Sequence, residues 1–294
     1  ELPEQPLTFD INDENLEIFI HFQNGKYNFI GQKGDTYPQQ KPLNDNAISI
    51  SMDAQMLLNG ISRSLFATAD DELRPVMNGV YFDIHTDDLT FVASDGHKLV
   101  RLRNLAVKSP ERASFILPKK PANLLKNLLA KESEQVLIKF DDNNAYITCT
   151  NFEMVCRLIE GRYPNYNSVI PQENPFKVTI DRISFLNALK RVSVFSNPAS
   201  SLVKLHLKDS LITVSAQDID FSTSAEERIV CQFDGTELSI GFKATYLIEI
   251  LGNISSEEVV LELADPSRAG LIVPSENDED EDLLMLLMPM MLND

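Results

Sequence analysis

The chain has 294 residues, of which 43% are hydrophobic and 24% charged, an ordinary composition for a globular protein. This length is sufficient for two domains and part of a third. The formal net charge of −18 argues against binding to nucleic acid. Net charge describes the average surface, however, and a local basic face can coexist with it. No apolar run approaches the length of a membrane span, and no signal-peptide pattern opens the chain.

The cysteines bear on the compartment of the protein, and the first residue bears on whether the chain is a fragment. Cys149, Cys156 and Cys231 are odd in number and match no metal-ligand spacing, which favours free thiols in a reducing compartment. We therefore expect a cytoplasmic protein with no metal or other cofactor. The chain begins at Glu1 without an initiator methionine, so we also expect a fragment or a processed product.

Self-similarity along the chain predicts a repeated unit. Five stretches have alternating apolar residues around a central turn, the pattern of β-hairpins. They are 16–30, 79–93, 136–149, 202–214 and 259–273. Four of them follow a short strand and an amphipathic helix. These strand and helix pairs are 47–51 with 54–66, 114–117 with 122–129, 177–180 with 183–195, and 238–240 with 244–251. The unit is thus a strand, a helix and two or three strands, at a spacing of roughly 60 residues.

The repeat predicts an α+β fold of β-α-β-β units. Two units make a domain of ordinary size, so we expect domains at 47–170 and 171–294. Residues 1–46 hold only the last hairpin of an earlier unit and a linker, and about 78 residues of a first domain are expected to be missing. In the second helix, four residues are expected on one apolar side: Leu124, Leu125, Leu128 and Leu129.

Two charged regions stand out in this acidic chain. Residues 276–282 are expected to form a solvated loop that interrupts the last hairpin before a tail at 283–294. Basic residues gather on or beside the first three helices: Arg63, Lys119, Lys120, Lys126, Lys131, Arg182, Lys190 and Arg191. Basic side chains on one face attract phosphates without reading sequence, although an ordinary solvated face would have the same pattern.

Ser94, Asp95 and His97 are the candidates for nucleophilic catalysis, and they lie within four residues. Working triads bring their members together across the fold, which one tight turn cannot easily do. No Gly-x-Ser-x-Gly elbow, metal-binding motif or phosphate-cradling loop occurs in the sequence. The sequence therefore favours recognition over catalysis.

Four motifs then occur in the order and spacing of the bacterial DNA polymerase III β subunit, the sliding clamp. They are Ala93-Ser-Asp-Gly-His-Lys-Leu99, Glu160-Gly-Arg-Tyr-Pro-Asn-Tyr166, Ile240-Gly-Phe-Lys-Ala-Thr-Tyr-Leu247 and Leu287-Met-Pro-Met290. The chain resembles that family over essentially its whole length. The resemblance implies three similar domains that close head-to-tail as a homodimeric ring around duplex DNA, with helices inside and sheets outside. It also implies that this chain lacks most of the first domain.

The resemblance further implies a hydrophobic pocket between the middle and last domains that binds short linear peptides of polymerase, clamp loader and repair proteins. Its walls would be Met77, Ser94, Gly96, His97, Lys98, Leu99, Pro164, Val169, Lys243, Tyr246, Leu286, Met288, Pro289 and Met290. Methionine is deformable and suits a site with several partners. Taken singly, Leu286, Met288 and Met290 would more simply be core residues.

The function that we expect is that of a non-catalytic processivity factor that tethers a polymerase to DNA. Loose phosphate contacts would come from Arg63, Lys119, Lys120, Lys126 and Arg191. Such contacts hold no register, as sliding requires. The alternatives are a peptide-binding scaffold unconnected to DNA and a hydrolase that uses Ser94 and His97.

Overall fold

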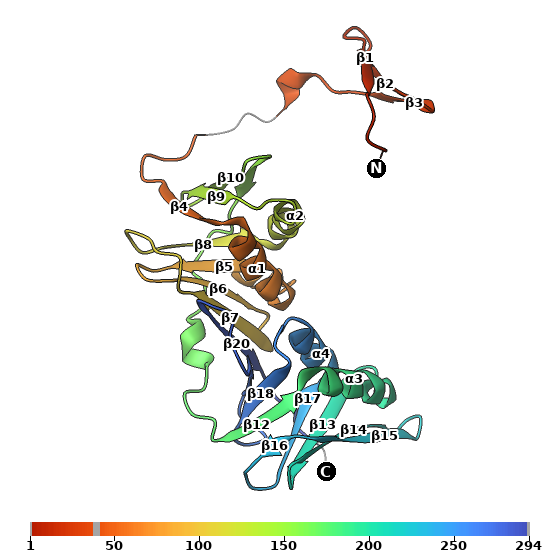
Figure 1. Cartoon of the computed structure of the whole chain (residues 1–294), viewed down its shortest axis with the longest axis vertical. Coiled ribbons are helices and arrows are strands. Elements are labelled where there is room, and N and C mark those ends of the chain that lie inside the picture. The colour runs from red at the N-terminus through yellow and green to blue at the C-terminus, as the bar shows by residue number, and fades with distance from the viewer. Residues whose placement is uncertain (1, 38–41, 293–294) are drawn as a thin grey trace. The chain divides into compact units, whose positions relative to one another are not determined.

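The computed structural model describes residues 2–37 and 42–292. Contacts between Cα atoms separate the chain into two units, Glu1–Pro42 and Leu43–Asp294. Figure 1 labels the helices and strands of both units. Every α-helix of the described residues lies in the larger unit, which therefore contains the predicted strand–helix repeats.

The smaller unit is an antiparallel sheet with the order β1-β2-β3. It consists of β1 (Thr8–Ile11), β2 (Glu17–Phe22) and β3 (Gly25–Ile30), and the 3-10 helix η1 (Gly34–Thr36) follows. β2 and β3 form the hairpin predicted at 16–30. A sheet of three short strands buries little apolar surface. Its large exposed apolar side chains are Phe9, Ile11, Tyr27, Phe29 and Ile30.

The larger unit contains a nine-stranded sheet and two four-stranded sheets among its described residues, and all of their pairings are antiparallel. The sheet orders are β16-β12-β18-β19-β20-β7-β6-β5-β8, β11-β10-β9-β4 and β15-β14-β13-β17. The strands are β4 (Ile48–Asp53), β5 (Gly79–Ile84), β6 (Leu89–Ser94), β7 (Lys98–Asn104), β8 (Ala113–Pro118), β9 (Gln135–Phe140), β10 (Asn144–Thr148), β11 (Glu153–Arg157), β12 (Phe176–Asp181), β13 (Leu202–Lys208), β14 (Leu211–Asp218), β15 (Thr223–Val230), β16 (Gln232–Phe233), β17 (Leu238–Lys243), β18 (Glu258–Leu263), β19 (Gly270–Pro274) and β20 (Glu281–Leu287).

The first strand of each repeat joins the sheet of the neighbouring repeat. β4 pairs with β9 and β8 pairs with β5. In the same way, β12 pairs with β18 and β17 pairs with β13. Because each repeat completes the sheet of the other, neither member of a pair can bury its apolar face alone. This mixture of helices and predominant strands in β-α-β-β units confirms the predicted α+β class.

Four helices begin directly after the first strands of the repeats: α1 (Ala54–Ser64), α2 (Lys119–Leu129), α3 (Arg182–Val192) and α4 (Ala244–Gly252). The Asp53 carboxylate caps α1 by accepting hydrogen bonds from the amides of Gln55 and Met56, and Asp181 caps α3 by accepting from the Ser184 amide. α1 lies close against the sheet, since a Cβ atom at Gly60 would come within 2.4 Å of the Phe91 ring.

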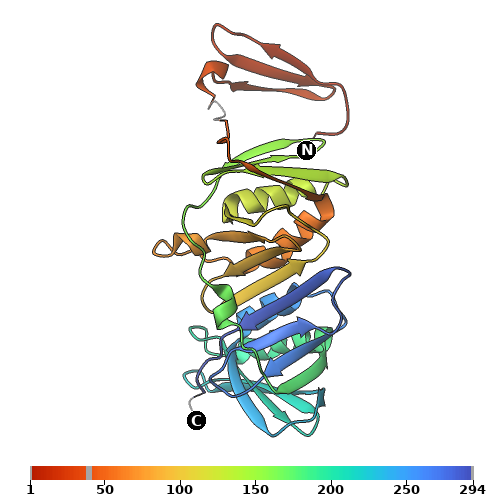
Figure 2. The same cartoon turned by 90° about the vertical axis from the view of Figure 1, so that its left-hand side faces the viewer.

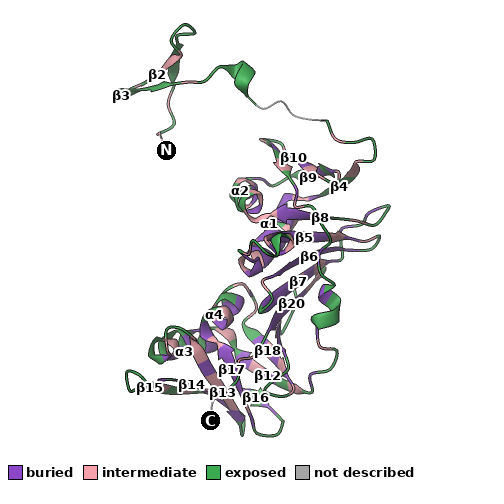
Figure 3. Cartoon of the chain, turned by 180° about the vertical axis from the view of Figure 1, so that it is seen from behind, coloured by how far each residue is buried: buried purple, intermediate pink, exposed green. Residues whose placement is uncertain are grey.

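The helices lie on the same side of the nine-stranded sheet in Figure 1, with α1 packed on α2 and α3 packed on α4. Figure 3 shows the buried residues gathered along the sheets and on the helix faces that meet them. The segment that contains the 3-10 helix η4 (Tyr166–Val169) crosses the opposite face of the sheet. A second apolar cluster forms under it, to which Tyr163 and Tyr166 contribute.

The pairing of β7 with β20 joins the two halves of the nine-stranded sheet. Its register runs from Leu287 opposite Lys98 to Glu281 opposite Asn104. In Figure 2 the golden strands of the earlier repeats continue beside the blue strands of the last one. Residues almost two hundred positions apart in the sequence thereby become neighbours.

Two expectations for local structure were wrong. Leu124 is 52% exposed, whereas Ala122, Leu125 and Leu129 form the buried stripe of α2. At 100° per residue, Leu124 points well away from that stripe. The tail expected at 283–294 begins later, because 283–287 belong to β20.

The acidic segment 276–282 is also not a purely solvated loop. Arg63 of α1 forms ion pairs with Asp278 and Glu281, the latter at 3.0 Å, and the Asn59 amide donates to Glu281 at 2.6 Å. Burial raises the pKa of the Glu281 carboxyl, and Arg63 and Asn59 offset only part of that shift. The end of the segment at Glu281 is therefore held to α1 by a buried ion pair, whereas 276–280 are exposed.

The division of the larger unit into domains at 47–170 and 171–294 stays a prediction, as does the assignment of 1–46 to a remnant and linker. Within residues 2–37 and 42–292, no helix is long and apolar enough to cross a membrane.

We expect Arg63→Met to lower the free energy of unfolding by about 3 kcal/mol, because it leaves a buried carboxylate without its cation. The Glu281 side chain is only 8% exposed, and that of Arg63 is 13% exposed. Arg191→Met is the matched control, since the Arg191 side chain is 62% exposed and its ion pair with Glu227 contributes little. Urea denaturation at neutral pH measures both changes. Equal losses in the two variants would contradict the prediction.

Candidate functional site

The turn between β6 and β7 is held by its own polar side chains. The Ser94 hydroxyl donates to the Lys98 carbonyl at 2.8 Å and accepts from the Gly96 amide at 3.1 Å. The Asp95 carboxylate accepts from the amides of His97 and Lys98 at 2.8 and 2.9 Å. The serine and the aspartate therefore fix the backbone of the turn.

Glycine is required in this turn, and an arginine covers it. Gly96 has φ +92°, a left-handed conformation that favours glycine. The Arg74 guanidinium lies 2.9 Å from where a Cβ atom of Gly96 would stand, and it donates to the Asp95 carbonyl at 3.3 Å. Asp71 holds Arg74 from the other side at 2.7 Å. Sequence reasoning missed Arg74 because its only signal was its place three residues before Met77.

Lys98 is a buried cation with three partners. Its ammonium lies 2.9 Å from Asp95, 3.3 Å from Glu249 of α4 and 4.0 Å from the centroid of the Tyr246 ring. Burial would lower the pKa of Lys98, but Asp95 and Glu249 outweigh burial and raise that pKa. Because the charge is compensated on all sides, Lys98 can remain buried and tie the turn to α4.

Side chains from distant parts of the sequence gather around the Tyr246 ring. The Lys243 ammonium lies 4.8 Å from the centroid of the Tyr246 ring. Lys243 is far in sequence from the turn that contributes Lys98. The His97 ring stacks near the Tyr246 ring, with 6.2 Å between centroids. The half-buried Tyr246 ring thus has two cations and an imidazole around it.

The residues after β20 lie along the same turn. The Met288 amide donates to the His97 carbonyl at 2.8 Å, and the Met290 amide donates to the Gly241 carbonyl at 2.8 Å. A Cβ atom at Gly241 would come within 2.7 Å of the Met290 carbonyl oxygen, so glycine permits this close approach. The Met288-Pro-Met290 segment is therefore held by backbone hydrogen bonds to the turn on one side and to β17 on the other.

The predicted wall residues include both buried and exposed side chains, and their grouping into one pocket stays a prediction. The buried ones are Met77, Ser94, Lys98, Leu99 and Leu286. Leu99 and Leu286 face each other in the β7–β20 pairing and belong to the apolar cluster of Tyr163 and Tyr166. The exposed or half-buried ones are Gly96, His97, Pro164, Val169, Lys243, Tyr246, Met288, Pro289 and Met290. Pro164 and Val169 bracket Tyr166 in the chain.

The geometry gives no support for catalysis at this turn. The Ser94 hydroxyl is engaged by backbone groups of its own turn, and the His97 ring lies against Tyr246. A nucleophile must be within hydrogen-bond reach of its base. In residues 2–37 and 42–292, no group of three or more His, Cys, Asp or Glu side chains could hold a metal ion.

The five basic side chains expected to face DNA have different surroundings. Arg63 is engaged with Asp278 and Glu281 of the acidic segment. Lys119 lies 2.5 Å from Asp70, and Arg191 forms a two-point pair with Glu227 at 2.6 and 2.8 Å. Lys120 and Lys126 have no ion-pair partner in the part of the chain that the structure describes.

Apolar side chains are exposed among the predicted wall residues. Val169 is 55% exposed and Met288 is 42% exposed. Solvent-facing apolar side chains beside a rigid, charge-compensated turn are typical of an interaction surface.

Comparison with known proteins gives the same family in sequence and in structure. Residues 51–165 match the sequence model of the DNA polymerase III beta subunit, central domain, and residues 167–291 match that of its C-terminal domain. The chain is 27% identical over 284 residues to the beta sliding clamp of Pseudomonas aeruginosa, covering 96% of the chain and 76% of that protein. It is also 27% identical over 287 residues to the beta sliding clamp of Staphylococcus aureus, covering 97% and 75% respectively.

A solved structure extends the likeness to three dimensions. The crystal structure of the sliding clamp (DNA polymerase III subunit beta) from Pseudomonas aeruginosa bound to griselimycin superposes with a TM-score of 0.90. It is 26% identical in sequence, and the match covers 99% of this chain and 78% of that one.

Asp95→Asn should lower the free energy of unfolding at neutral pH. The difference in this free energy between the variant and the unsubstituted chain should shrink in acid. Burial would raise the pKa of Asp95, but hydrogen bonds from Lys98 and from backbone amides hold it below its ordinary value. A carboxylate with a depressed folded-state pKa adds stability above its unfolded pKa of about 3.9 and loses it as the pH falls through the folded value. Urea unfolding from pH 7 to about pH 2.5 measures this difference, and a difference that stays constant would contradict the prediction.

Proposed function

Because this chain belongs to the family of DNA polymerase III beta subunits, the sliding clamps, we propose that it binds partner proteins through a short peptide segment at the β7–β20 junction. Sliding clamps are non-catalytic processivity subunits of DNA replication, and this chain is one of them. The observation that carries the proposal is the hydrogen bond from Met288 to His97, which brings the tail beside the turn. The partners would be the replicative polymerase, the clamp loader and repair proteins.

The chemistry of the junction suits peptide anchors. Met288 presents a flexible thioether, Pro289 and Pro164 give rigid edges, and Tyr246 offers an apolar ring with a polar tip. Anchor residues of a peptide are typically apolar and enter small pockets in such surfaces. Sliding-clamp structures from Pseudomonas aeruginosa and Bartonella birtlesii contain bound griselimycin. We propose that griselimycin binds this chain at the same junction.

Met288→Glu should weaken griselimycin binding at least tenfold, roughly the effect of losing one hot-spot side chain. Met291→Glu is the matched control, because Met291 is 77% exposed and lies outside the proposed walls. Isothermal titration calorimetry measures both. Equal weakening by the two substitutions, or no binding to the unsubstituted chain, would sink the proposal.

The larger unit also has an exposed apolar patch that supports assembly into a ring. Val194 and Phe195 of the 3-10 helix η5 (Ser193–Phe195) are 78% and 40% exposed, and Phe221 before β15 is 75% exposed. η5 contacts β14 and β15, and β15 is an edge strand with unpaired backbone groups. Exposed apolar side chains beside a free strand edge are suited to pairing with a second copy. We propose this patch as the contact with the next subunit of the homodimeric ring.

Duplex DNA would pass along the helix side of the larger unit. Lys120 and Lys126 are the cations proposed to contribute most there, because no carboxylate neutralises them locally among the described residues. Lys119, Arg191 and Arg63 are proposed to contribute less, since their charges are already paired. Few and loose phosphate contacts permit sliding.

DNA association is expected to weaken with salt, and the slope of log K against log [salt] measures how many phosphates are neutralised. Replacing Lys120 and Lys126 together by glutamine should reduce the magnitude of this slope by nearly two, about 0.9 for each phosphate that the variant no longer neutralises. A matched control replaces Lys177 and Lys208, which are paired with Glu262 and Glu237. Fluorescence anisotropy of a labelled duplex at low salt measures the slope. An unchanged slope in the first variant, or the same change in both, would contradict the DNA-facing assignment.

A further inference from the structure

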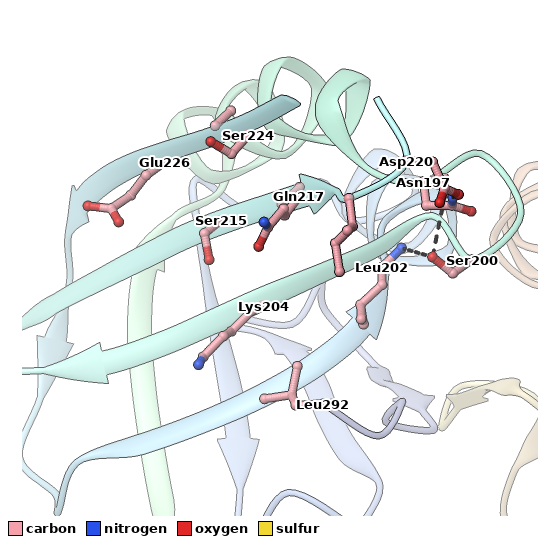
Figure 4. A pocket seen from close by; sticks show the side chains of 13 residues that line it. Asn197, Ser200, Leu202, Lys204, Ser215, Gln217, Asp220, Ser224, Glu226 and Leu292 are labelled. Atoms are coloured by element: carbon pink, nitrogen blue, oxygen red, sulfur yellow. Dashed lines mark hydrogen bonds between the residues drawn. The ribbon is translucent and has the colours of Figure 1, made fainter. Parts of the chain in front are cut away.

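A groove crosses the sheet of β15, β14, β13 and β17 on the face away from the helices. It has a volume of about 640 Å³. Its lining includes Leu202, Lys204, Ser215, Gln217, Ser224 and Leu292. Figure 4 shows the Lys204, Ser215 and Gln217 side chains rising from neighbouring strands, with Leu292 beside Lys204. Polar residues outnumber apolar ones in this lining.

Strand register places these side chains in one row. Lys204 stands opposite Ser215 on β14 and opposite Gly241 on β17, and Ser215 stands opposite Glu226 on β15. Alternate residues such as Val203 and Leu205 are fully buried on the helix side. Because side chains alternate between the two faces of a strand, the row from Gly241 to Glu226 must face outward.

The groove adjoins the strand and tail that contribute to the proposed peptide pocket. The Gly241 carbonyl accepts the hydrogen bond from the Met290 amide, and the side chains of Leu292 and Leu202 both lie over Gly241. Lys243, which lies over the Tyr246 ring, is two residues further along the same strand and pairs with Leu202. A peptide anchored at Met288 to Met290 would therefore reach the groove without leaving the surface.

The charges in the groove favour a carboxylate as the incoming group. Neither Lys204 nor Lys243 has an ion-pair partner in residues 2–37 and 42–292, although the chain has 44 acidic residues. Glu226 lies at the far side of the row, separated from Lys204 by Ser215, and is engaged by Arg228 at 3.0 Å. Asp220 interacts with the Asn197 amide at 3.4 Å at the groove's other end. The two lysines thus remain available on the side next to the pocket.

We propose that this groove is an extension of the peptide site that takes acidic residues flanking the apolar anchors of a partner peptide. Lys204 is the specificity-determining residue, and Lys243 stands between it and the apolar pocket. Diagonal neighbours on adjacent strands are about 7–8 Å apart, which an extended peptide spans in two or three residues. Ser215 and Gln217 supply hydrogen-bonding groups for its backbone. The inference rests on the proposed function, whose pocket supplies the anchor.

The test uses three fluorescein-labelled peptides and this chain. One peptide has a Leu-Leu-Phe core with serine and glycine on both sides. The other two carry Asp-Asp either before or after the same core. One acidic peptide should bind about three- to tenfold more tightly than the neutral one, as a charge-assisted contact at a half-buried site provides. That advantage should shrink as the salt concentration rises from about 50 to about 500 mM.

Lys204→Gln should remove most of the advantage and leave the affinity for the neutral peptide unchanged. Lys208→Gln is the matched control, because Lys208 lies on the same face of β13 but at its far end, paired with Glu237 at 3.0 Å. Lys208→Gln should keep the advantage. Circular dichroism confirms that both variants are folded.

The outcomes separate this inference from the function on which it rests. If the neutral peptide fails to bind, the proposed function and this inference are both overturned. If the neutral peptide binds and neither acidic peptide binds more tightly, only the groove assignment is overturned. Equal effects of the two lysine substitutions also overturn it. So does a change in oligomeric state on Lys204→Gln, which would assign the groove to a second copy of the chain.

Discussion

The site depends on the antiparallel pairing of β7 with β20. This pairing brings Leu99 opposite Leu286. It also places the segment that follows β20 beside the β6–β7 turn, where the Met288 amide donates to the His97 carbonyl. β20 is buried on both faces: Leu283, Met285 and Leu287 join the cluster under the helices, and Leu284 and Leu286 join the one under η4. A strand covered on both sides cannot shift register by one residue without disrupting both apolar clusters. The pairing therefore fixes where the tail lies relative to the turn.

Buried charge stands at each end of this strand pair. At one end, Arg63 and Asn59 hold Glu281, the first residue of β20. At the other, Asp95 and Glu249 hold Lys98, the first residue of β7. Both networks cross from one half of the nine-stranded sheet to elements of the other half. A charge left unpaired at either end would be costly, so these networks favour the one arrangement in which both are satisfied.

The acidic composition is compatible with this function because charge is allocated locally. Several cations near the helices, such as Lys119 and Arg191, are neutralised by carboxylates, while Lys120 and Lys126 are not so neutralised within the described ranges. On the outer face, Lys204 and Lys243 also lack carboxylate partners among the described residues. A net charge of −18 therefore says little about what any one face attracts.

Much of the fold could be predicted from the sequence because its repeats have clear local periods. Hairpins such as 79–93 and helices such as α3 follow from alternation, turn residues and helical spacing. Leu124 was misplaced because a cluster of leucines has no unique apolar side until the packing partner is known. β20 was mistaken for a tail because an uninterrupted run of apolar residues lacks a strand period when both faces are buried.

The site was predictable only in part. The motif residues of the turn and tail were identifiable, but their contacts join segments far apart in the chain. No local signal could show that Arg63 would face Glu281, or that Arg74 would cover Gly96. Those contacts arise only when strand pairing has closed the long loops between them. The reassignment of Ser94 and Asp95 from a possible triad to a rigid turn has the same origin.

The central claim is that peptide recognition occurs where β7 meets the segment after β20, and the methionines report on it directly. Methyl NMR spectra of methionine-labelled protein, recorded with and without the neutral Leu-Leu-Phe peptide, give the test. The account predicts that the resonances of Met288, Met290 and Met77 shift, while those of Met52 and Met154 stay in place. Shifts confined to Met52 and Met154, or no shifts at a saturating peptide concentration, would contradict it.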